Sequence, residues 1–135
     1  MANKVAHASG KRKRAIARAT IREGRGLIRI NDQLLENYHP EIARIRISEP
    51  LVIAGDIAKK LNVWVTVRGS GWSSQAEAAR LAIAKALINF TGSEELKKSF
   101  LEYDRHLLVA DTRRKEPRKP MTHSKARAKR QKSYR

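Results

Sequence analysis

The chain has 135 residues, with 30 Lys or Arg against 13 Asp or Glu, so its formal net charge at pH 7 is +17. An excess of this size is unusual for a soluble enzyme and favours a polyanionic partner, because each neutralised phosphate releases counterions. The chain has no cysteine, which excludes disulfides and thiolate metal sites, and its four histidines lack zinc-ligand spacing, so no cofactor is expected.

The sequence also argues against a membrane protein. No segment approaches the roughly 18 apolar residues that a membrane helix needs, and no apolar signal core follows the first residues. We therefore expect a cytoplasmic protein without a membrane partner.

The positive charge is concentrated at the C-terminus. Residues 112–135 carry eleven Lys and Arg against one acid, Glu116, and so hold +10 of the +17. Their few apolar side chains cannot offset the entropy of ordering this segment alone. We expect residues 1–111 to form a globular RNA-binding domain and residues 112–135 to form an extended basic tail that a polyanion orders.

The first part of the chain predicts a sheet. Residues 5–9 and 15–22 have strand character, and the second segment alternates small apolar with larger or polar side chains. A glycine-containing turn follows at residues 23–26, and residues 27–30 are expected to return antiparallel as a hairpin.

The middle of the chain predicts two helices and a strand. Residues 40–46 indicate a short helix, and Ser48, Glu49 and Pro50 suit the start of a second helix that runs to Lys60. The β-branched residues Val63, Val65 and Val67, at period two, form the clearest strand pattern in the chain.

The remaining elements are a long helix, a short helix and a short strand. Ser74 and Glu77 have the spacing of a capping box at the start of the long helix. Its predicted buried stripe consists of Ala76, Ala79, Ile83, Ala86, Leu87 and Phe90. A shorter helix is expected at residues 94–101 and a last strand at residues 107–109.

This order of elements implies an α+β fold with two layers, a sheet covered by helices on one face. The other sheet face, or its loops, would remain free for a partner.

Three basic or glycine-rich clusters are candidate sites. The first is the run Lys11, Arg12, Lys13 and Arg14, which opens a strand that also carries Arg18. Basic runs are most often solvated surface, but beside the basic tail we favour contact with phosphates. Arg22, Arg25 and Arg29 continue the same sign of charge.

The second cluster is a loop between a strand and a helix. It contains Arg68, Gly69, Ser70, Gly71, Trp72, Ser73 and Gln75. Free amides at a helix N-terminus favour an anion, and glycines allow close backbone approach. A nucleotide site of a small-molecule kinase is the enzymatic alternative, but the loop lacks a terminal Lys-Ser/Thr and no acidic pair is evident for magnesium. The loop as a simple helix connection also stays open, and Trp72 would either stack on RNA or pack on the domain.

The third cluster is the tail. Its cations are Arg113, Arg114, Lys115, Arg118, Lys119, Lys125, Arg127, Lys129, Arg130, Lys132 and Arg135. Fully extended, the tail would span roughly 80 Å, several times the radius expected for the body. A generic disordered arm is the alternative.

The order and spacing of these residues resemble the small-subunit ribosomal protein family conventionally numbered nine, over nearly the whole chain. The matching positions are Gly10, Arg12, Lys13, Ala17, Arg18, Gly24, Gly26, Ile30, Asn31, Tyr38, Pro50, Leu51, Val67, Gly69, Gly71, Ser73, Gln75, Ala79, Arg80, Ala86, Leu87, Asp111, Arg113, Glu116, Lys125, Ala126, Arg127, Ser133, Tyr134 and Arg135. Ser70 and Ser74 replace glycines of the bacterial pattern and, with Pro117, Pro120 and Tyr134, resemble the archaeal and eukaryotic branch.

The resemblance implies a left-handed strand-helix-strand crossover, against the general right-handed preference. It implies no enzymatic activity but a structural role in the small ribosomal subunit, with ribosomal RNA of the head and other head proteins as partners. The basic run, Arg18, the loop and the tail up to Arg130 would bind this RNA. The final residues, Lys132, Ser133, Tyr134 and Arg135, would reach the peptidyl-site transfer RNA. A free-standing nucleic-acid-binding module and a small phosphate-binding enzyme remain the rival classes.

Overall fold

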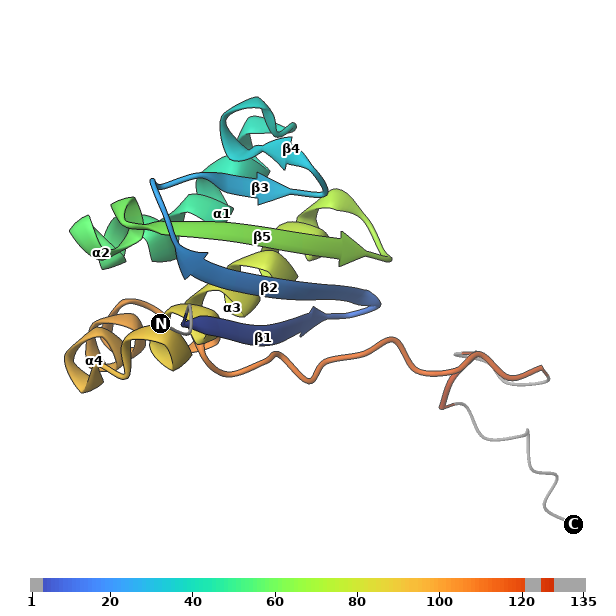
Figure 1. Ribbon diagram of the computed structural model, residues 1–135. Helices are drawn as coiled ribbons and strands as arrows, with labels where there is room; N and C mark the ends of the chain where they lie inside the picture. The colour runs from blue at the N-terminus through green and yellow to red at the C-terminus, as the bar shows by residue number, and fades with distance from the viewer. Residues whose placement is uncertain (1–3, 121–124, 128–135) are drawn as a thin grey trace, which may run out of the picture.

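A computed structural model describes residues 4–120 and 125–127, which form a five-stranded sheet with helices on one face (Figure 1). The strands are β1 (Val5–Arg12), β2 (Ala15–Glu23), β3 (Ile28–Ile30), β4 (Gln33–Leu34) and β5 (Leu61–Arg68), in the sheet order β1-β2-β5-β3-β4. The helices are α1 (Glu41–Ala54), α2 (Asp56–Lys59), α3 (Trp72–Thr91) and α4 (Glu94–Tyr103), with 3₁₀ turns at Leu35–Asn37 and Arg105–Leu107. The predicted α+β class is confirmed.

Strict alternation of side chains in the central strands creates the two faces of the sheet. On β2 the residues Ala15, Ala17, Ala19 and Ile21 are buried, and on β5 the residues Leu61, Val63, Val65 and Val67 are buried. The two strands are antiparallel, and Ala17 lies opposite Val67. Successive residues of a strand point to opposite faces, so the residues between them lie on the uncovered side.

The alanine-rich helix α3 lies against this inner face. All six residues of its predicted stripe are buried. A Cβ on Gly10 would lie 2.3 Å from the carbonyl oxygen of Ala78 and 2.8 Å from the amide nitrogen of Ala82. Gly10 therefore lets the backbones of β1 and α3 approach more closely than any side chain permits. Helix α1 also packs against α3, and Ala78 and Ala82, beside Gly10, are buried together with Ala84.

The predicted hairpin between residues 15–22 and 27–30 is wrong. β2 pairs with β1 on one side and with β5 on the other, whereas β3 pairs in parallel with β5 and antiparallel with β4. The glycine turn does bring β3 back antiparallel to β2, but β5 is inserted between them. The pairing of β3 with β5 is stabilised by buried Val and Ile side chains on both strands. Because these strands are far apart in the sequence, a local turn pattern cannot predict their pairing. The left-handed sense of the crossover from β3 to β5 stays a prediction.

Residues 40–60 do contain two helices, but the predicted break before Pro50 is wrong. α1 continues through Pro50, which is buried together with Ala43, Ile47, Leu51 and Ala54. These residues form one apolar stripe, and its burial outweighs the hydrogen bond that proline cannot donate. The helix ends instead at Gly55, whose φ is 56°.

Two further local signals proved misleading. Helix α3 begins at Trp72 after Gly71, with no side-chain cap, so Ser74 and Glu77 do not form the predicted capping box. Ser93 does cap α4 by accepting a hydrogen bond from the Leu96 amide, which confirms the short helix. The predicted strand at residues 107–109 is absent, because Leu107 ends a 3₁₀ turn and is fully buried in the core.

Candidate nucleic-acid interface

The first cationic cluster forms the tip of a hairpin at one end of the sheet. β1 and β2 pair up to Arg12 and Ala15, and Lys13 and Arg14 make the connecting turn. Lys13 has a φ of 52°, and both turn residues are exposed. The tight turn thus projects two adjacent cations beyond the edge of the core.

The glycine loop lies beside this tip. Gly69 has a φ of 86°, and a Cβ there would lie 2.5 Å from the carbonyl oxygen of Arg14. The side chain of Gln75 donates a hydrogen bond of 3.2 Å to the Gly69 carbonyl and holds the loop against the start of α3. Ser70, with a φ of 57°, and Gly71 are exposed. The predicted second cluster is therefore adjacent to the first.

The root of the tail joins the same end. Arg114 donates a hydrogen bond from its guanidinium to the carbonyl oxygen of Lys13. The tail root, the hairpin tip and the loop enclose a hollow of about 840 Å³. Its lining residues are Lys13, Arg14, Ser70, Arg113, Arg114, Lys115, Glu116, Pro117 and Arg118. Six of these are cations and one is a carboxylate, so the hollow attracts anions.

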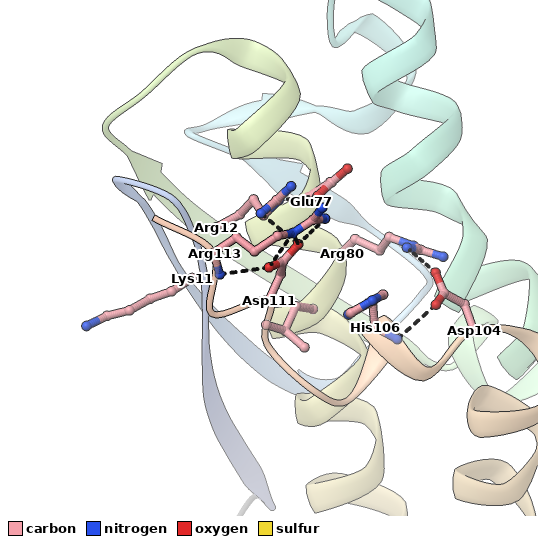
Figure 2. A pocket seen from close by; sticks show the side chains of 9 residues that line it. Lys11, Arg12, Glu77, Arg80, Asp104, His106, Asp111 and Arg113 are labelled. Atoms are coloured by element: carbon pink, nitrogen blue, oxygen red, sulfur yellow. Dashed lines mark hydrogen bonds and ion pairs between the residues drawn. The ribbon is translucent and has the colours of Figure 1, made fainter. Parts of the chain in front are cut away.

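Behind this surface, an ion-pair network fixes where the tail leaves the body (Figure 2). Arg12 places its Nε 2.8 Å from Glu77 Oε2 and its terminal nitrogen 2.8 Å from Asp111 Oδ2. The other oxygen of Glu77 lies 2.6 Å from a guanidinium nitrogen of Arg46. The network thus joins β1, α3, α1 and the residue where the tail begins.

Arg80 makes a second set of pairs nearby. Its guanidinium nitrogens lie 2.5 Å from Glu49 Oε2 and 2.9 Å from Asp104 Oδ2, and its side chain is 13% exposed. Burial raises the pKa of Asp104, but hydrogen bonds from the His106 amide and from Arg80 outweigh it and lower this pKa overall. These cations are matched by carboxylates inside the protein and serve its own structure.

Asp111 is the anchor of the tail root. It accepts hydrogen bonds from the Arg113 guanidinium and, at 2.9 Å, from the Arg113 amide. These bonds, together with the charge of Arg12, hold the pKa of the Asp111 carboxyl well below its usual range. Asp111 therefore stays ionised and joins Arg113 of the tail root to Arg12 of β1.

The structure separates the predicted site residues into groups. Lys13, Arg14, Gly69, Ser70, Gly71 and Arg113–Arg118 meet at the cationic end, with Ser73 and Gln75 in the adjoining first turn of α3. Lys11, Arg18 and Arg68 lie on the uncovered sheet face instead. Arg12 has two carboxylate partners, so its contact with RNA stays a prediction.

The described part of the tail lies outside the core. Residues 112–120 are all exposed and form no helix or strand, and Figure 1 shows them leading away from the sheet. Arg127 pairs with Glu116, its Nε lying 2.7 Å from the carboxylate. Lys125 is also exposed, whereas Lys129, Arg130 and the four predicted transfer-RNA contacts lie outside the described residues.

Sequence patterns did not reveal the network residues Arg46, Glu49, Glu77 and Asp104. Glu77 was assigned to a helix cap, because a hydroxyl three residues before it mimics that motif. The one sequence feature that could have indicated the network is that Glu49 and Glu77 are single acids on otherwise apolar or basic helix faces.

Within residues 4–120 and 125–127, no three His, Asp or Glu side chains gather closely enough to hold a metal ion. In the same residues, no helix combines the length and apolar character needed to cross a membrane. An exposed cationic end that joins a hairpin tip, a glycine loop and a basic arm is typical of proteins that bind nucleic acid by its phosphates.

Comparison with known proteins agrees with this class. Residues 10–135 match the model of the family described as ribosomal protein S9/S16. The chain is 54% identical over 133 residues to small ribosomal subunit protein uS9 of Methanococcus vannielii, covering 98% of this chain and 99% of that protein. It is 52% identical, with the same coverage, to the proteins of that name from Methanococcus maripaludis strains C7 and C5.

The chain therefore belongs to the ribosomal protein S9/S16 family, and the resemblance found in its sequence is confirmed. It is a ribosomal protein, a component of a ribonucleoprotein that acts in translation in the cytoplasm. Members of this family have a structural rather than an enzymatic role.

Proposed function

We propose that this protein is a structural constituent of the small ribosomal subunit and binds the ribosomal RNA of its head through the cationic end. The observation that carries the proposal is the convergence of the hairpin tip, the glycine loop and the tail root on one hollow with six cations. The names of the Methanococcus relatives support the assignment to the small subunit. The arrangement of cations around the hollow supports binding through RNA phosphates.

The mechanism is electrostatic and positional. Cations at the hairpin tip and tail root neutralise phosphates where RNA strands come close together, and the loop backbone approaches them without side chains in the way. The Arg12–Glu77–Asp111 network holds the tail root in one place, which orients the arm before RNA is met. No bond is made or broken, and the proposal involves no cofactor, small-molecule substrate or membrane.

The residues proposed to contact ribosomal RNA extend from the body into the tail. They are Lys11, Arg12, Lys13, Arg14, Arg18, Arg68, Gly69, Ser70, Gly71, Ser73, Gln75, Arg113, Arg114, Lys115, Arg118, Lys119, Lys125, Arg127, Lys129 and Arg130. Arg12 could contact RNA only if its guanidinium binds a phosphate while it remains paired with Glu77 and Asp111.

The end of the tail is proposed to reach the peptidyl-site transfer RNA with Lys132, Ser133, Tyr134 and Arg135. Residues 112–120 are exposed and lead away from the core, which supports this role. An arm packed on its own domain could not contact a distant transfer RNA. Removing residues 132–135 should weaken transfer-RNA binding to isolated subunits while subunits still assemble. Normal binding at several salt concentrations would contradict this part of the proposal.

Contacts with other proteins of the head are proposed for α1. Ile42, Ile45 and Val52 are 55% to 75% exposed on this helix, and none of them carries charge. Apolar side chains on the surface of so basic a protein suit a protein neighbour better than RNA.

The test of subunit membership is sedimentation of tagged protein in a lysate gradient. The protein should travel with small subunits and stay with them at moderate salt. Release at moderate salt with binding to assorted nucleic acids would indicate a free-standing module, and nucleotide binding by the isolated chain would indicate an enzyme.

A further inference from the structure

The sheet face turned away from the helices is a second cationic surface, distinct from the end described above. It carries the strand residues that alternate with the buried ones. These are Val5, His7, Ser9 and Lys11 on β1, Ile16, Arg18, Thr20 and Arg22 on β2, Arg29 on β3, Leu34 on β4, and Asn62, Trp64, Thr66 and Arg68 on β5. Figure 1 shows the helices behind this face of the sheet. We refer to these residues as the open sheet face.

All the charge on the open sheet face has one sign. Its charged residues are Lys11, Arg18, Arg22, Arg29 and Arg68, and it carries no Asp or Glu. All five are exposed, and within the described chain none of them forms an ion pair. This differs from Arg12, Arg46 and Arg80, whose carboxylate partners are built into the fold. A solvated face kept only for solubility would normally mix both signs.

Trp64 lies in the middle of this face. Its neighbours across the sheet are Thr20 on β2 and Arg29 on β3, and neighbouring strands lie about 4.8 Å apart. Its side chain is 38% exposed, and the guanidinium of Arg22 lies 6.0 Å from its ring centroid. The contact with Arg22 occupies one side of the indole ring. The indole is therefore partly exposed and has cations on neighbouring strands.

We propose that the open sheet face binds a single-stranded segment of RNA, with an unpaired base stacked on Trp64 and the flanking phosphates contacted by Arg18, Arg29 and Arg68. An aromatic side chain on an uncovered sheet, surrounded by Lys and Arg, offers both components of single-strand recognition. A duplex is disfavoured because its bases already stack on one another. An acidic protein partner would form ion pairs with the cations but would not provide a base to stack on the indole of Trp64.

The open sheet face adjoins the cationic end of the protein. Lys11 precedes the ion-paired Arg12 on β1, and Arg68 precedes Gly69 of the loop, so the two surfaces meet and one strand of RNA can contact both. The inference rests on the proposed binding of ribosomal RNA, but it concerns another surface and a different kind of contact.

The chain has two tryptophans, which makes a direct test simple. In the full-length Trp72→Phe variant, all tryptophan emission comes from Trp64. A short single-stranded RNA should quench this emission, whereas an abasic oligonucleotide of the same length should bind through its phosphates with little quenching. Trp64→Leu should lower the affinity for the RNA by about five- to one-hundredfold, and Trp64→Phe should retain most of it.

The cations of this face are tested by Arg29→Gln, with Lys98→Gln on α4 as the matched control on the helical layer. Arg29→Gln should reduce the slope of log affinity against log salt by about 0.7, and the control should leave it unchanged. Unfolding curves of each variant verify that the fold is intact.

Equal quenching by the RNA and the abasic oligonucleotide, or an unchanged affinity in Trp64→Leu, would overturn the proposal. Stronger binding of polyglutamate than of RNA would overturn it in favour of a protein partner. Failure of the proposed function gives a different result, namely no salt-dependent binding of either oligonucleotide.

Discussion

Gly69 lies directly against Arg14, so that a Cβ on Gly69 would come within 2.5 Å of the Arg14 carbonyl oxygen. This contact connects the loop after β5 to the tip of the β1–β2 hairpin. It combines two requirements for glycine, a φ of 86° and a missing side chain.

Gly69→Ala should therefore displace the loop from the hairpin tip. Gly92→Ala is the matched control, because Gly92 has a φ of 66° but a Cβ added there would meet no atom within 4 Å. The control should cost about 1 kcal/mol from backbone conformation alone, and Gly69→Ala should cost about 1–3 kcal/mol more. Urea unfolding measures both. Equal losses of stability would show that the contact with Arg14 is unimportant.

Glu77→Gln should destabilise the protein by about 1–3 kcal/mol, because it leaves Arg12 and Arg46 near each other without the carboxylate between them. The control is Glu94→Gln on α4, where the carboxylate is 77% exposed and lies 3.6 Å from Lys97. This exposed pair should contribute less than about 0.5 kcal/mol. A similar small effect for both variants in urea unfolding would contradict a structural role for the network.

The lowered pKa values of Asp104 and Asp111 predict a loss of stability in acid. In the unfolded chain these carboxyls take up protons near pH 3.9, whereas in the folded protein they remain ionised at lower pH. The unfolded state then binds more protons, so the free energy of unfolding falls as the pH drops below about 4.

Asp111→Asn should make this fall shallower, which urea unfolding at a series of pH values between about 3 and 6 measures. Asp56→Asn is the control, because Asp56 is 88% exposed and, among residues 4–120 and 125–127, pairs only with Lys59 on its own helix. An unchanged slope in Asp111→Asn would contradict the anchoring role of Asp111.

Asn31→Ala should loosen the end of β5 that leads into the glycine loop. The Asn31 side chain accepts a hydrogen bond from the Val67 amide at 2.9 Å and donates one to the Val67 carbonyl at 3.1 Å. Their loss should cost about 1–3 kcal/mol and speed amide exchange at Val67. Asp32→Ala controls for backbone conformation, since Asp32 also has a positive φ, of 67°. Slow exchange at Val67 in Asn31→Ala would show that the strand does not need this side chain.

The elements that sequence predicts well are those with a strong period. Val63, Val65 and Val67 alternate on β5, and the apolar stripe of α3 repeats at helical spacing; burial confirms both. These patterns are local and reflect which face of one element meets the core.

What the sequence did not predict depends on partners far away in the chain. β3 pairs with β5 rather than β2, and α1 continues through Pro50 because both sides of the break bury the same stripe. Glu77 has its partners on β1 and α1 rather than at its own helix start. In each case tertiary packing outweighed a correct local rule.

The residues of the candidate site could be predicted from the sequence, but their meeting at one place in the fold could not. The basic run, the loop and the tail are evident as separate clusters, and their meeting at one hollow depends on the sheet order. The sequence also did not distinguish Arg12, held by two carboxylates, from its exposed neighbours Lys13 and Arg14.

The most direct test of the central claim compares two double variants of the full chain for binding to small-subunit ribosomal RNA over a range of salt. Lys13→Gln/Arg14→Gln removes two cations from the hairpin tip, and Lys97→Gln/Lys98→Gln removes two exposed cations from α4. We predict that the first variant lowers the slope of log affinity against log salt by about 1.4 to 1.8, whereas the second leaves it unchanged. Equal slopes for the two variants would contradict an RNA interface at the hairpin tip.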